Sequence, residues 1–267
     1  MIEEAQMPSK YREVIDKQVK IFKEGSTVQD RTKIPDTKDI PIENPKHWLK
    51  IPDVICLFVD MKGSTKLSAS NYDKSTAAAF QLFTRTAVRL FDKFESPYID
   101  IKGDGVMALF NHDEPYKAVA AAITFRTFAN NVYTPIIQKK TDLEIKSHIG
   151  IDQKTVLVRK IGLKKHDGRT DRQNELWAGK PVNMASKLAS HSNGEEILVS
   201  DRFFKNIKND LVLKSCGCPE GSVESLWKEV DLSKDDKFDF NSAYSCKSFW
   251  CAEHGEQYFD SILKLDS

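Results

Sequence analysis

Residues 54–65 read VICLFVDMKGST, and residues 98–110 read YIDIKGDGVMALF. Each stretch contains an apolar run of strand length with an aspartate at its polar turn, Asp60 in the first and Asp104 in the second. A carboxylate at the end of a buried strand is costly to leave unpaired, and two such carboxylates commonly hold divalent metal ions. The glycine and hydroxyl residues after Asp60 add backbone N–H groups that can bind phosphate oxygens where a helix begins. Together these features suggest two-metal chemistry on a nucleoside triphosphate.

Strand and helix signals alternate around these two stretches. The patterns predict strands at 54–60, 97–102 and 105–110, a hairpin of strands at 144–152 and 155–161, a strand at 195–199, and helices at about 70–94, 114–133, 181–191 and 201–208. A polar loop is predicted between the hairpin and the helix at 181–191. The order β-α-β-β-α-β predicts an α+β domain of the ferredoxin-like kind, with helices on one face of a sheet.

Composition and periodicity divide the chain into three parts. They are an N-terminal helix and extended arm (1–50), a catalytic domain (51–210), and a strand-and-loop appendage packed on the same domain (211–267). The amphipathic helix at 9–24 is stopped by Gly25, and the proline-containing arm at 26–46 is either a linker or a strap that packs on a partner subunit.

Charge and hydropathy exclude several classes of partner. The 267 residues carry 40 basic and 39 acidic side chains, a net charge of +1, so we expect no nucleic-acid partner. Apolar runs all fall short of the roughly 20 residues needed to span a bilayer, and the N-terminus lacks a signal-peptide core. We therefore expect a soluble, cytoplasmic protein without a membrane partner.

The five cysteines argue against a disulfide framework, because their number is odd and Cys56 lies inside the first strand run. The others are Cys216, Cys218, Cys246 and Cys251, with His254 close behind. They could form a zinc site, but the spacings are not those of a common zinc module. Reduced cysteines also serve as small buried hydrophobes. The sequence leaves both interpretations open.

A second polar motif lies in residues 175–188, ELWAGKPVNMASKL, which is predicted to open a helix. Asn183 and Lys187 are four residues apart and therefore share one helix face. An asparagine and a lysine near a helix start suit a ribose and a phosphate. Alternatively, this is the solvated face of an ordinary amphipathic helix.

Taken in order, the motifs resemble the catalytic domain of the class III nucleotidyl cyclases over residues 50–205. They are Phe-x-Asp-Met-x-Gly-Ser-Thr, Gly-Asp-Gly after a strand, Gly150-Ile151, and Gly-x-x-Val-Asn-x-Ala-x-Lys. Within that superfamily the chain looks most like the bacterial pyrimidine (uridylate or cytidylate) cyclases of the Pycsar antiphage system. Its stand-alone architecture, N-terminal arm, WAGKPVNMA helix motif and FWCAEHG ending carry this closer resemblance.

The resemblance implies a role for each motif. It implies metal binding by Asp60, Asp104 and the Met61 carbonyl, with two Mn²⁺ or Mg²⁺ ions per site, triphosphate binding by Lys62, Gly63, Ser64 and Thr65, and catalysis by Asn183 and Lys187. It also implies a homodimer with shared sites, in which Asn183 and Lys187 reach in from the second subunit. Lys187 stands where the family has an arginine, and it offers charge without the planar fork. Arg159 is another cation that could contribute.

The base pocket departs from the adenylyl cyclase pattern, and Phe58, Asp100 and Leu176 are the candidate base-binding residues. In adenylyl cyclases of this class a lysine stands where this chain has Asp100, and an aspartate where it has Leu176, with Glu175 beside it. An ionised Asp100 can only accept hydrogen bonds, which suits uracil, cytosine or guanine better than adenine. Alternatively, Asp100 points away from the pocket, because a one-residue shift of register reverses a strand's faces.

We therefore expect a homodimeric cyclase that converts a nucleoside triphosphate, UTP in the first place, into its 3′,5′-cyclic monophosphate and diphosphate. The resemblance implies that the product activates a separate effector in antiphage defence. The alternatives are a cyclase for CTP, GTP or ATP, and an inactive nucleotide-binding signalling module, which the Lys187 departure would favour.

Overall fold

A computed structural model of the chain describes residues 8–69, 73–163, 172–219 and 221–266. Its helices are α1 (Ser9–Lys23), α2 (Ser64–Ala69), α3 (Asp73–Lys93), α4 (Pro115–Phe128), α5 (Thr134–Thr141), α6 (Lys180–His191), α7 (Asp201–Phe204), α8 (Asp210–Leu213) and α9 (Gly255–Leu263), with short 3₁₀ turns at Thr37–Asp39 and Lys264–Asp266 and a π turn at Ala129–Tyr133. Its strands are β1 (Thr27–Asp30), β2 (His47–Lys62), β3 (Tyr98–Lys102), β4 (Gly105–Phe110), β5 (Lys146–Gly162), β6 (Gln173–Gly179), β7 (Ile197–Ser200), β8 (Trp227–Asp231) and β9 (Ser242–Cys246).

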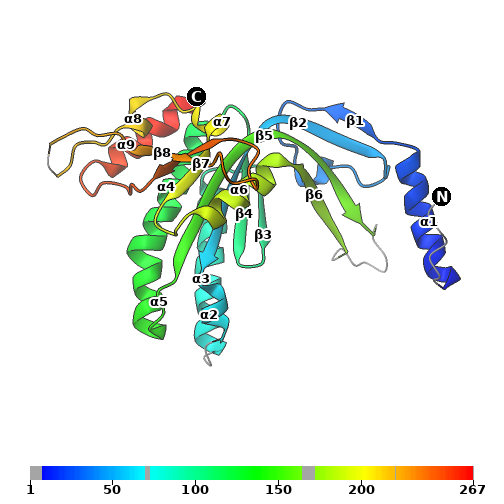
Figure 1. The fold of residues 1–267 in the computed structure, drawn as a ribbon, viewed down its shortest axis with the longest axis horizontal. Coiled ribbons are helices and arrows are strands. Elements are labelled where there is room, and N and C mark those ends of the chain that lie inside the picture. The colour runs from blue at the N-terminus through cyan, green and yellow to red at the C-terminus, as the bar shows by residue number, and fades with distance from the viewer. Residues whose placement is uncertain (1–7, 70–72, 164–171, 220, 267) are drawn as a thin grey trace.

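In the described part of the chain, one nine-stranded sheet organises the fold, in the order β3-β4-β2-β5-β7-β9-β8, with β1 added to β2 and β6 added to β5 (Figure 1). β2 is the central strand, antiparallel to β4 on one side and to β5 on the other. β7 runs parallel to β5, and β9 and β8 continue the sheet as an antiparallel pair. This mixed α+β sheet confirms the predicted fold class.

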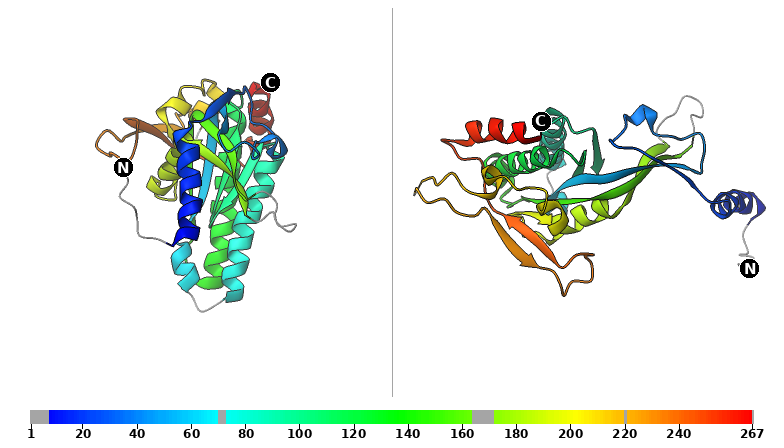
Figure 2. Two further views of the ribbon diagram at one scale, coloured as in Figure 1. Left: turned by 90° about the vertical axis from the view of Figure 1, so that its right-hand side faces the viewer. Right: turned by 90° about the horizontal axis from the view of Figure 1, so that it is seen from above.

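The two faces of the sheet are covered by different helices. Alternate residues of β2 point to opposite faces, so Ile55, Leu57 and Val59 pack in the core under α3 and α4, whereas Cys56 and Phe58 belong to a second core under α6. Figure 2 shows α4 on one side of the sheet and α6 on the other. The helices of the βαββαβ unit thus share a face as predicted, and α6 covers the opposite one.

The predicted hairpin at 144–152 and 155–161 is wrong, because the structure has a single strand there, β5, paired with β2 from Leu49–Val158 to Lys62–Lys146. Asp152, next to the expected turn, is fully buried, and the Arg202 Nε donates to its Oδ1 at 2.7 Å. β6, which pairs with the end of β5, lies in a segment predicted to be a polar loop. The rest of that loop, at 164–171, lies outside the described residues.

Both ends of the chain contribute to the main sheet or its cores. The arm forms β1, which pairs in parallel with the start of β2, and it buries Ile34 and Ile40 in the second core. The C-terminal part is more than strands and loops, because β8 and β9 extend the main sheet and α9 packs beside α4. α1 forms as predicted and projects from the body of the molecule (Figure 1), and it carries large exposed side chains such as Phe22, which is 85% exposed.

The position of α6 on the sheet depends on the close approach of its backbone to β5. A Cβ added at Gly150 would lie 2.1 Å from the Ala185 carbonyl oxygen and 2.5 Å from the Ala189 nitrogen, far inside van der Waals contact. A glycine at this position therefore fixes how near the helix that carries Asn183 and Lys187 lies to the sheet.

A search of the described helices for one both long and apolar enough to cross a bilayer finds none.

Candidate active site

Strand pairing places the two predicted metal-binding aspartates at one end of the sheet. β4 pairs with β2 only as far as Val59–Val106, whereas β5 continues to Lys62. The edge of β2 that carries Asp60 is therefore open on the β4 side. The β3–β4 turn lies next to this edge. The first residue of this two-residue turn, Gly103, takes the left-handed conformation (φ +66°) that the turn requires there, and Asp104 is the second residue.

The electrostatics of Asp60 shows that the two carboxylates interact. Burial and then the negative charge of Asp104 raise the pKa of Asp60, while the Met61 backbone N–H, which donates to the carboxylate, lowers it. Within the described part of the chain neither aspartate forms an ion pair with a lysine or arginine. Two half-buried carboxylates that have no cationic partner among the described residues are suitable ligands for a hard divalent cation such as Mg²⁺ or Mn²⁺.

The neighbours of this pair are neutral groups. The buried Met61 side chain accepts a hydrogen bond from the Tyr133 hydroxyl at 3.4 Å, and burial and then Asp104 raise the pKa of Tyr133, so this phenol stays protonated. His148 stands opposite Asp60 in the β2–β5 register. Burial and then the charge of Lys62 lower the pKa of His148, which keeps the imidazole uncharged at neutral pH.

The predicted phosphate turn follows directly after β2. Gly63 adopts φ +95°, and its carbonyl accepts from the Leu67 N–H at 3.1 Å to start α2. Ser64 and Thr65 are the first residues of that helix and are not fully buried. The structure does not place Lys62 with them, because its ammonium donates to the Asn193 carbonyl at 2.7 Å.

The base candidates separate into two groups. Asp100 and Glu175 lie on the two sides of the Tyr98 hydroxyl, which is 3.4 Å from a carboxylate oxygen of each. Lys102 pairs with Asp100 at 2.5 Å, and Lys160 lies 3.8 Å from Glu175. An acidic cluster with cationic partners therefore joins β3 to β6.

Leu176 is not part of that cluster. Its neighbours Glu175 and Trp177 point toward Tyr98, whose ring centroid lies 4.8 Å from that of Trp177. Because successive residues of a strand alternate in direction, Leu176 faces the other way, and it is 45% exposed. Phe58 lies nearer the metal aspartates, with its ring against the backbone of Gly105.

Asn183 and Lys187 share a face of α6 as predicted, but within one chain they do not meet the aspartates. Asn183 is exposed, and the Lys187 ammonium donates to the Lys237 carbonyl at 2.7 Å. The suggestion that Arg159 contributes a catalytic cation is wrong. Arg159 is 3% exposed, lies over the Trp48 ring, and donates to the carbonyls of Pro45 and Lys160, so it fastens the arm to the sheet.

Sequence reasoning missed two aromatic residues of this region, Tyr98 and Trp177. Both are buried against each other between β3 and β6. The signal that could have found Trp177 is strand alternation, since it lies two residues from Glu175. That signal was hidden because residues 173–179 were predicted to be a loop.

The match to a protein family covers the part of the chain that holds these residues. Residues 49–218 match the adenylate and guanylate cyclase catalytic domain, and the chain therefore belongs to this family of class III cyclases. Members of this fold class in general use Mg²⁺ or Mn²⁺ ions and act on nucleoside triphosphates.

Relatives with assigned names lie within the same family. A protein of Propioniciclava tarda named uridylate cyclase is 30% identical over 255 residues, 93% of this chain and 82% of the relative. A protein of Micromonospora echinofusca with the same name is 31% identical over 234 residues, 86% of this chain and 75% of the relative. A cytidylate cyclase of Staphylococcus aureus is 27% identical over 176 residues, 61% of this chain and 39% of the relative.

Solved structures agree on the fold. The adenylyl cyclase CyaB from P. aeruginosa superposes with a TM-score of 0.59 at 19% identity, covering 77% of this chain and 97% of that one. The guanylyl cyclase Cya2 gives a TM-score of 0.56 at 16% identity, covering 74% and 91%. At these identities the likeness concerns the fold alone.

Replacing Asp60 by asparagine should raise the melting temperature of metal-free protein at pH 7. Because its folded-state pKa is raised, the folded chain binds this proton more tightly than the unfolded chain, and stability falls as pH rises above the ordinary value of about 3.9. The asparagine amide would keep an acceptor for the Met61 N–H without the charge. Thermal unfolding in a chelating buffer should show the gain at pH 7 and a smaller gain near pH 4.

Added Mn²⁺ should raise the melting temperature of the parent more than that of Asp60→Asn, so that the parent becomes the more stable of the two. The reason is that a ligand that binds only the folded state raises the stability of that state. Asp236→Asn is the matched control, since Asp236 is exposed, and it should respond to Mn²⁺ like the parent. An equal Mn²⁺ response of the parent and Asp60→Asn would show that Asp60 is not a metal ligand.

Proposed function

We propose that this protein is a pyrimidine nucleotide cyclase that converts UTP into 3′,5′-cyclic UMP and diphosphate. The observation that carries the proposal is the acidic cluster of Asp100, Tyr98 and Glu175, in which Asp100 stands where adenylyl cyclases have the lysine that reads adenine. This cluster argues against adenine, and the names of the two relatives at 30% and 31% identity support uracil among the remaining bases.

In the proposed reaction the ribose 3′-hydroxyl gives up its proton to water and its oxygen attacks the α-phosphorus. The bond from that phosphorus to the bridging oxygen breaks, and diphosphate leaves with the electron pair. Two divalent ions, when bound, would supply positive charge for the phosphates and lower the pKa of the 3′-hydroxyl. Asp60, Asp104 and the Met61 carbonyl would hold these ions. Positioning rather than covalent chemistry then accounts for the rate.

The remaining polar residues would position the substrate. Backbone N–H groups and hydroxyls of Gly63, Ser64 and Thr65 would donate to the triphosphate oxygens. Asn183 would hydrogen-bond the ribose, and Lys187 would place its ammonium near the charge that develops on the phosphorus oxygens. In the free chain that ammonium rests on the Lys237 carbonyl, a neutral acceptor that it can exchange for a phosphate.

The acidic cluster would recognise the base by accepting hydrogen bonds from the N–H donors of the base. An ionised carboxylate accepts from the uracil N3–H but repels the unprotonated N1 of adenine. Lys102, paired with Asp100, could donate to a uracil carbonyl oxygen beside that N3–H. A carboxylate and an ammonium side by side therefore match the alternating acceptor and donor edge of uracil.

We further propose that the active unit is a homodimer with sites shared between subunits. The support is that Asn183 and Lys187 do not contact Asp60 or Asp104 within one chain, so a single described subunit leaves the two halves of the machinery apart. α1 supplies an exposed apolar stripe for a second subunit, with Tyr11, Val14 and Phe22 55%, 60% and 85% exposed. The proposed role of the product in antiphage signalling through a separate effector rests on the sequence resemblance.

The test of the function is an assay of purified protein with each of the four ribonucleoside triphosphates and Mn²⁺, with the products resolved by chromatography and mass spectrometry. Cyclic UMP should dominate, and Asp104→Ala should abolish it while the circular dichroism spectrum stays that of the parent. Dominant cyclic CMP, GMP or AMP would reject the choice of UTP. A protein that binds the nucleotides without turnover would be a signalling module rather than an enzyme.

Asp100→Asn should lower kcat/KM for UTP without lowering that for ATP in parallel. The amide keeps a carbonyl for the uracil N3–H but loses the charge that strengthens the hydrogen bond, a difference of about 1.5–3 kcal/mol, or roughly 10- to 150-fold. Leu176→Ala is the matched control, because this side chain faces away from the cluster. The measured quantity is the UTP/ATP ratio of kcat/KM. If Asp100→Asn and Glu175→Gln both leave it unchanged, the acidic cluster does not read the base.

Mixing inactive Asp60→Ala and Lys187→Ala proteins should restore activity, because a mixed dimer has one site with both lesions and one with neither. Random exchange should recover about a quarter of the parent activity. The control mixture is Asp60→Ala with Asp104→Ala, which leaves one metal ligand missing in each site and should stay inactive. Absence of rescue in the first mixture, with subunit exchange shown by native mass spectrometry, would contradict a shared site.

A further inference from the structure

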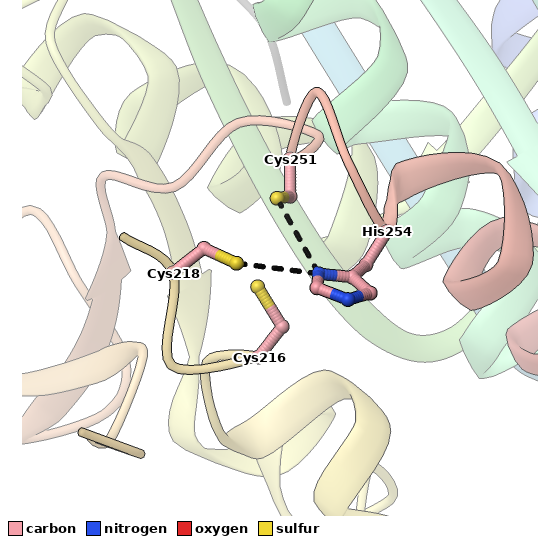
Figure 3. Close-up of side chains that lie close together, drawn as sticks. All are labelled: Cys216, Cys218, Cys251 and His254. Carbon is pink, nitrogen blue, oxygen red and sulfur yellow. Dashed lines mark hydrogen bonds between the residues drawn. The ribbon is translucent and has the colours of Figure 1, made fainter. Parts of the chain in front are cut away.

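Four side chains with soft metal-binding atoms converge near the C-terminus, far along the chain from the aspartates. Cys216 and Cys218 lie between α8 and β8, and Cys251 and His254 lie in the turn that enters α9. Their three sulfurs and the His254 ring nitrogen all lie within 4.8 Å of one another. Figure 3 shows the three thiols and the imidazole pointing toward a common centre from two separate segments.

The distances between the four ligand atoms lie close to those of a tetrahedral zinc site. The Cys218 Sγ lies 3.3 Å and the Cys251 Sγ 3.9 Å from the His254 Nδ1. With Zn–S bonds of about 2.3 Å and Zn–N bonds of about 2.0 Å, tetrahedral angles put ligand atoms about 3.5–3.8 Å apart. Shifts of less than about 1 Å would therefore bring all four atoms to bonding distance.

The exposure of the cysteines separates them into two kinds. Cys56 and Cys246 are fully buried and serve as small apolar core residues. Cys216, Cys218 and Cys251 are partly exposed free thiols, so apolar packing does not account for their convergence. The cluster therefore excludes Cys246, although it is near Cys251 in sequence, and it includes the pairs Cys-x-Cys and Cys-x-x-His.

The sulfur of Cys251 accepts from the backbone N–H groups of His254 and Glu253. The Cys218 Sγ contacts the Glu253 carboxylate at 3.4 Å, a side chain that is exposed and free to turn into solvent when a cation takes its place.

We propose that Cys216, Cys218, Cys251 and His254 bind one structural Zn²⁺ ion per chain. Three sulfurs and one imidazole are soft and borderline ligands, which select zinc over the Mg²⁺ and Mn²⁺ suited to the carboxylates of Asp60 and Asp104. Four protein ligands complete a tetrahedron and leave no position for a substrate, which is the pattern of a structural site rather than a catalytic one.

The ion would cross-link the segment at 214–226 to the start of α9. α9 is itself fastened to α4: the Trp250 Nε1 donates to the Thr124 Oγ1 at 2.8 Å, and Asp266 accepts from the Tyr116 and Lys117 N–H groups at 3.1 and 2.6 Å. The described residues 214–219 and 221–226 are held together by the bridge between Lys214 and Ser225 and by hydrogen bonds such as the one that the Ser215 N–H donates to the Glu224 carbonyl at 2.8 Å. Zinc would thus fasten this loop to the helix layer.

The test is the zinc content of the full chain, purified without chelator and measured by inductively coupled plasma mass spectrometry. The parent should hold about one zinc per chain, and Cys216→Ser and Cys251→Ser should hold close to none. Cys246→Ala is the matched control, because this cysteine lies outside the cluster, and it should keep its zinc. The Asp60→Asn/Asp104→Asn double variant should keep it as well, which separates this site from the active site.

A second measurement covers the case in which the cysteine variants do not fold. Parent protein stripped by a chelator and reloaded with Co²⁺ should show the intense visible bands of a tetrahedral thiolate centre, and reloading should restore the melting temperature lost on stripping. A parent without zinc whose cysteines are found as disulfides by mass spectrometry, or Co²⁺ bands of an octahedral oxygen site, would overturn the proposal. Equal zinc loss in Cys246→Ala and Cys251→Ser would overturn it too.

Discussion

The pairing of β2 between β4 and β5 is the constraint on which the candidate active site depends. β4 stops pairing at Val59, whereas β5 pairs on to Lys62, so the chain around Asp60 is held on one side and open on the other. The β3–β4 turn presents Asp104 beside this open edge. Two like charges oppose this arrangement, and the backbone hydrogen bonds of three strands hold it in place. A metal-free site of this kind stores repulsion that a divalent ion relieves.

Local patterns in the sequence predicted the elements that local forces determine. The β3–β4 hairpin follows from its Gly-Asp-Gly turn, and α3, α4 and α6 follow from their periodicity. The sequence patterns divided β5 into two predicted strands, 144–152 and 155–161, with the break directly after Asp152. What keeps the strand continuous is Arg202, fifty positions away, which neutralises the buried carboxylate. Such a partner cannot be identified before the fold is known. Because β5 was not predicted as one strand, the strand β6 that pairs with it was not predicted either.

The same limit applies to the site. Asp60 and Asp104 could be proposed as metal ligands because one lies near the end of an apolar strand and the other in the turn after one, but the acidic cluster proposed to read the base is made of residues that meet across 77 positions. Counting without gaps pointed to Leu176, whereas the strand places Glu175 on the inner face, since a one-residue difference reverses the direction of a side chain. Arg159 could be named a candidate from its charge alone. Its burial under the arm, against the Pro45 carbonyl, becomes visible only when the arm has been placed.

The proposed chemistry requires rapid exchange of the ions at one metal site and permanent retention of the ion at the other. The ligands at the two sites differ accordingly. Catalytic ions must accompany each triphosphate and leave with diphosphate, so their ligands should be few, hard and open to solvent on one side. Asp60, Asp104 and one carbonyl meet these conditions at an open strand edge. An ion that stabilises the fold must remain through every turnover, and four converging ligands of the Cys₃His kind would retain it. Separating the ligands by softness lets one chain hold both kinds of ion without exchange between them.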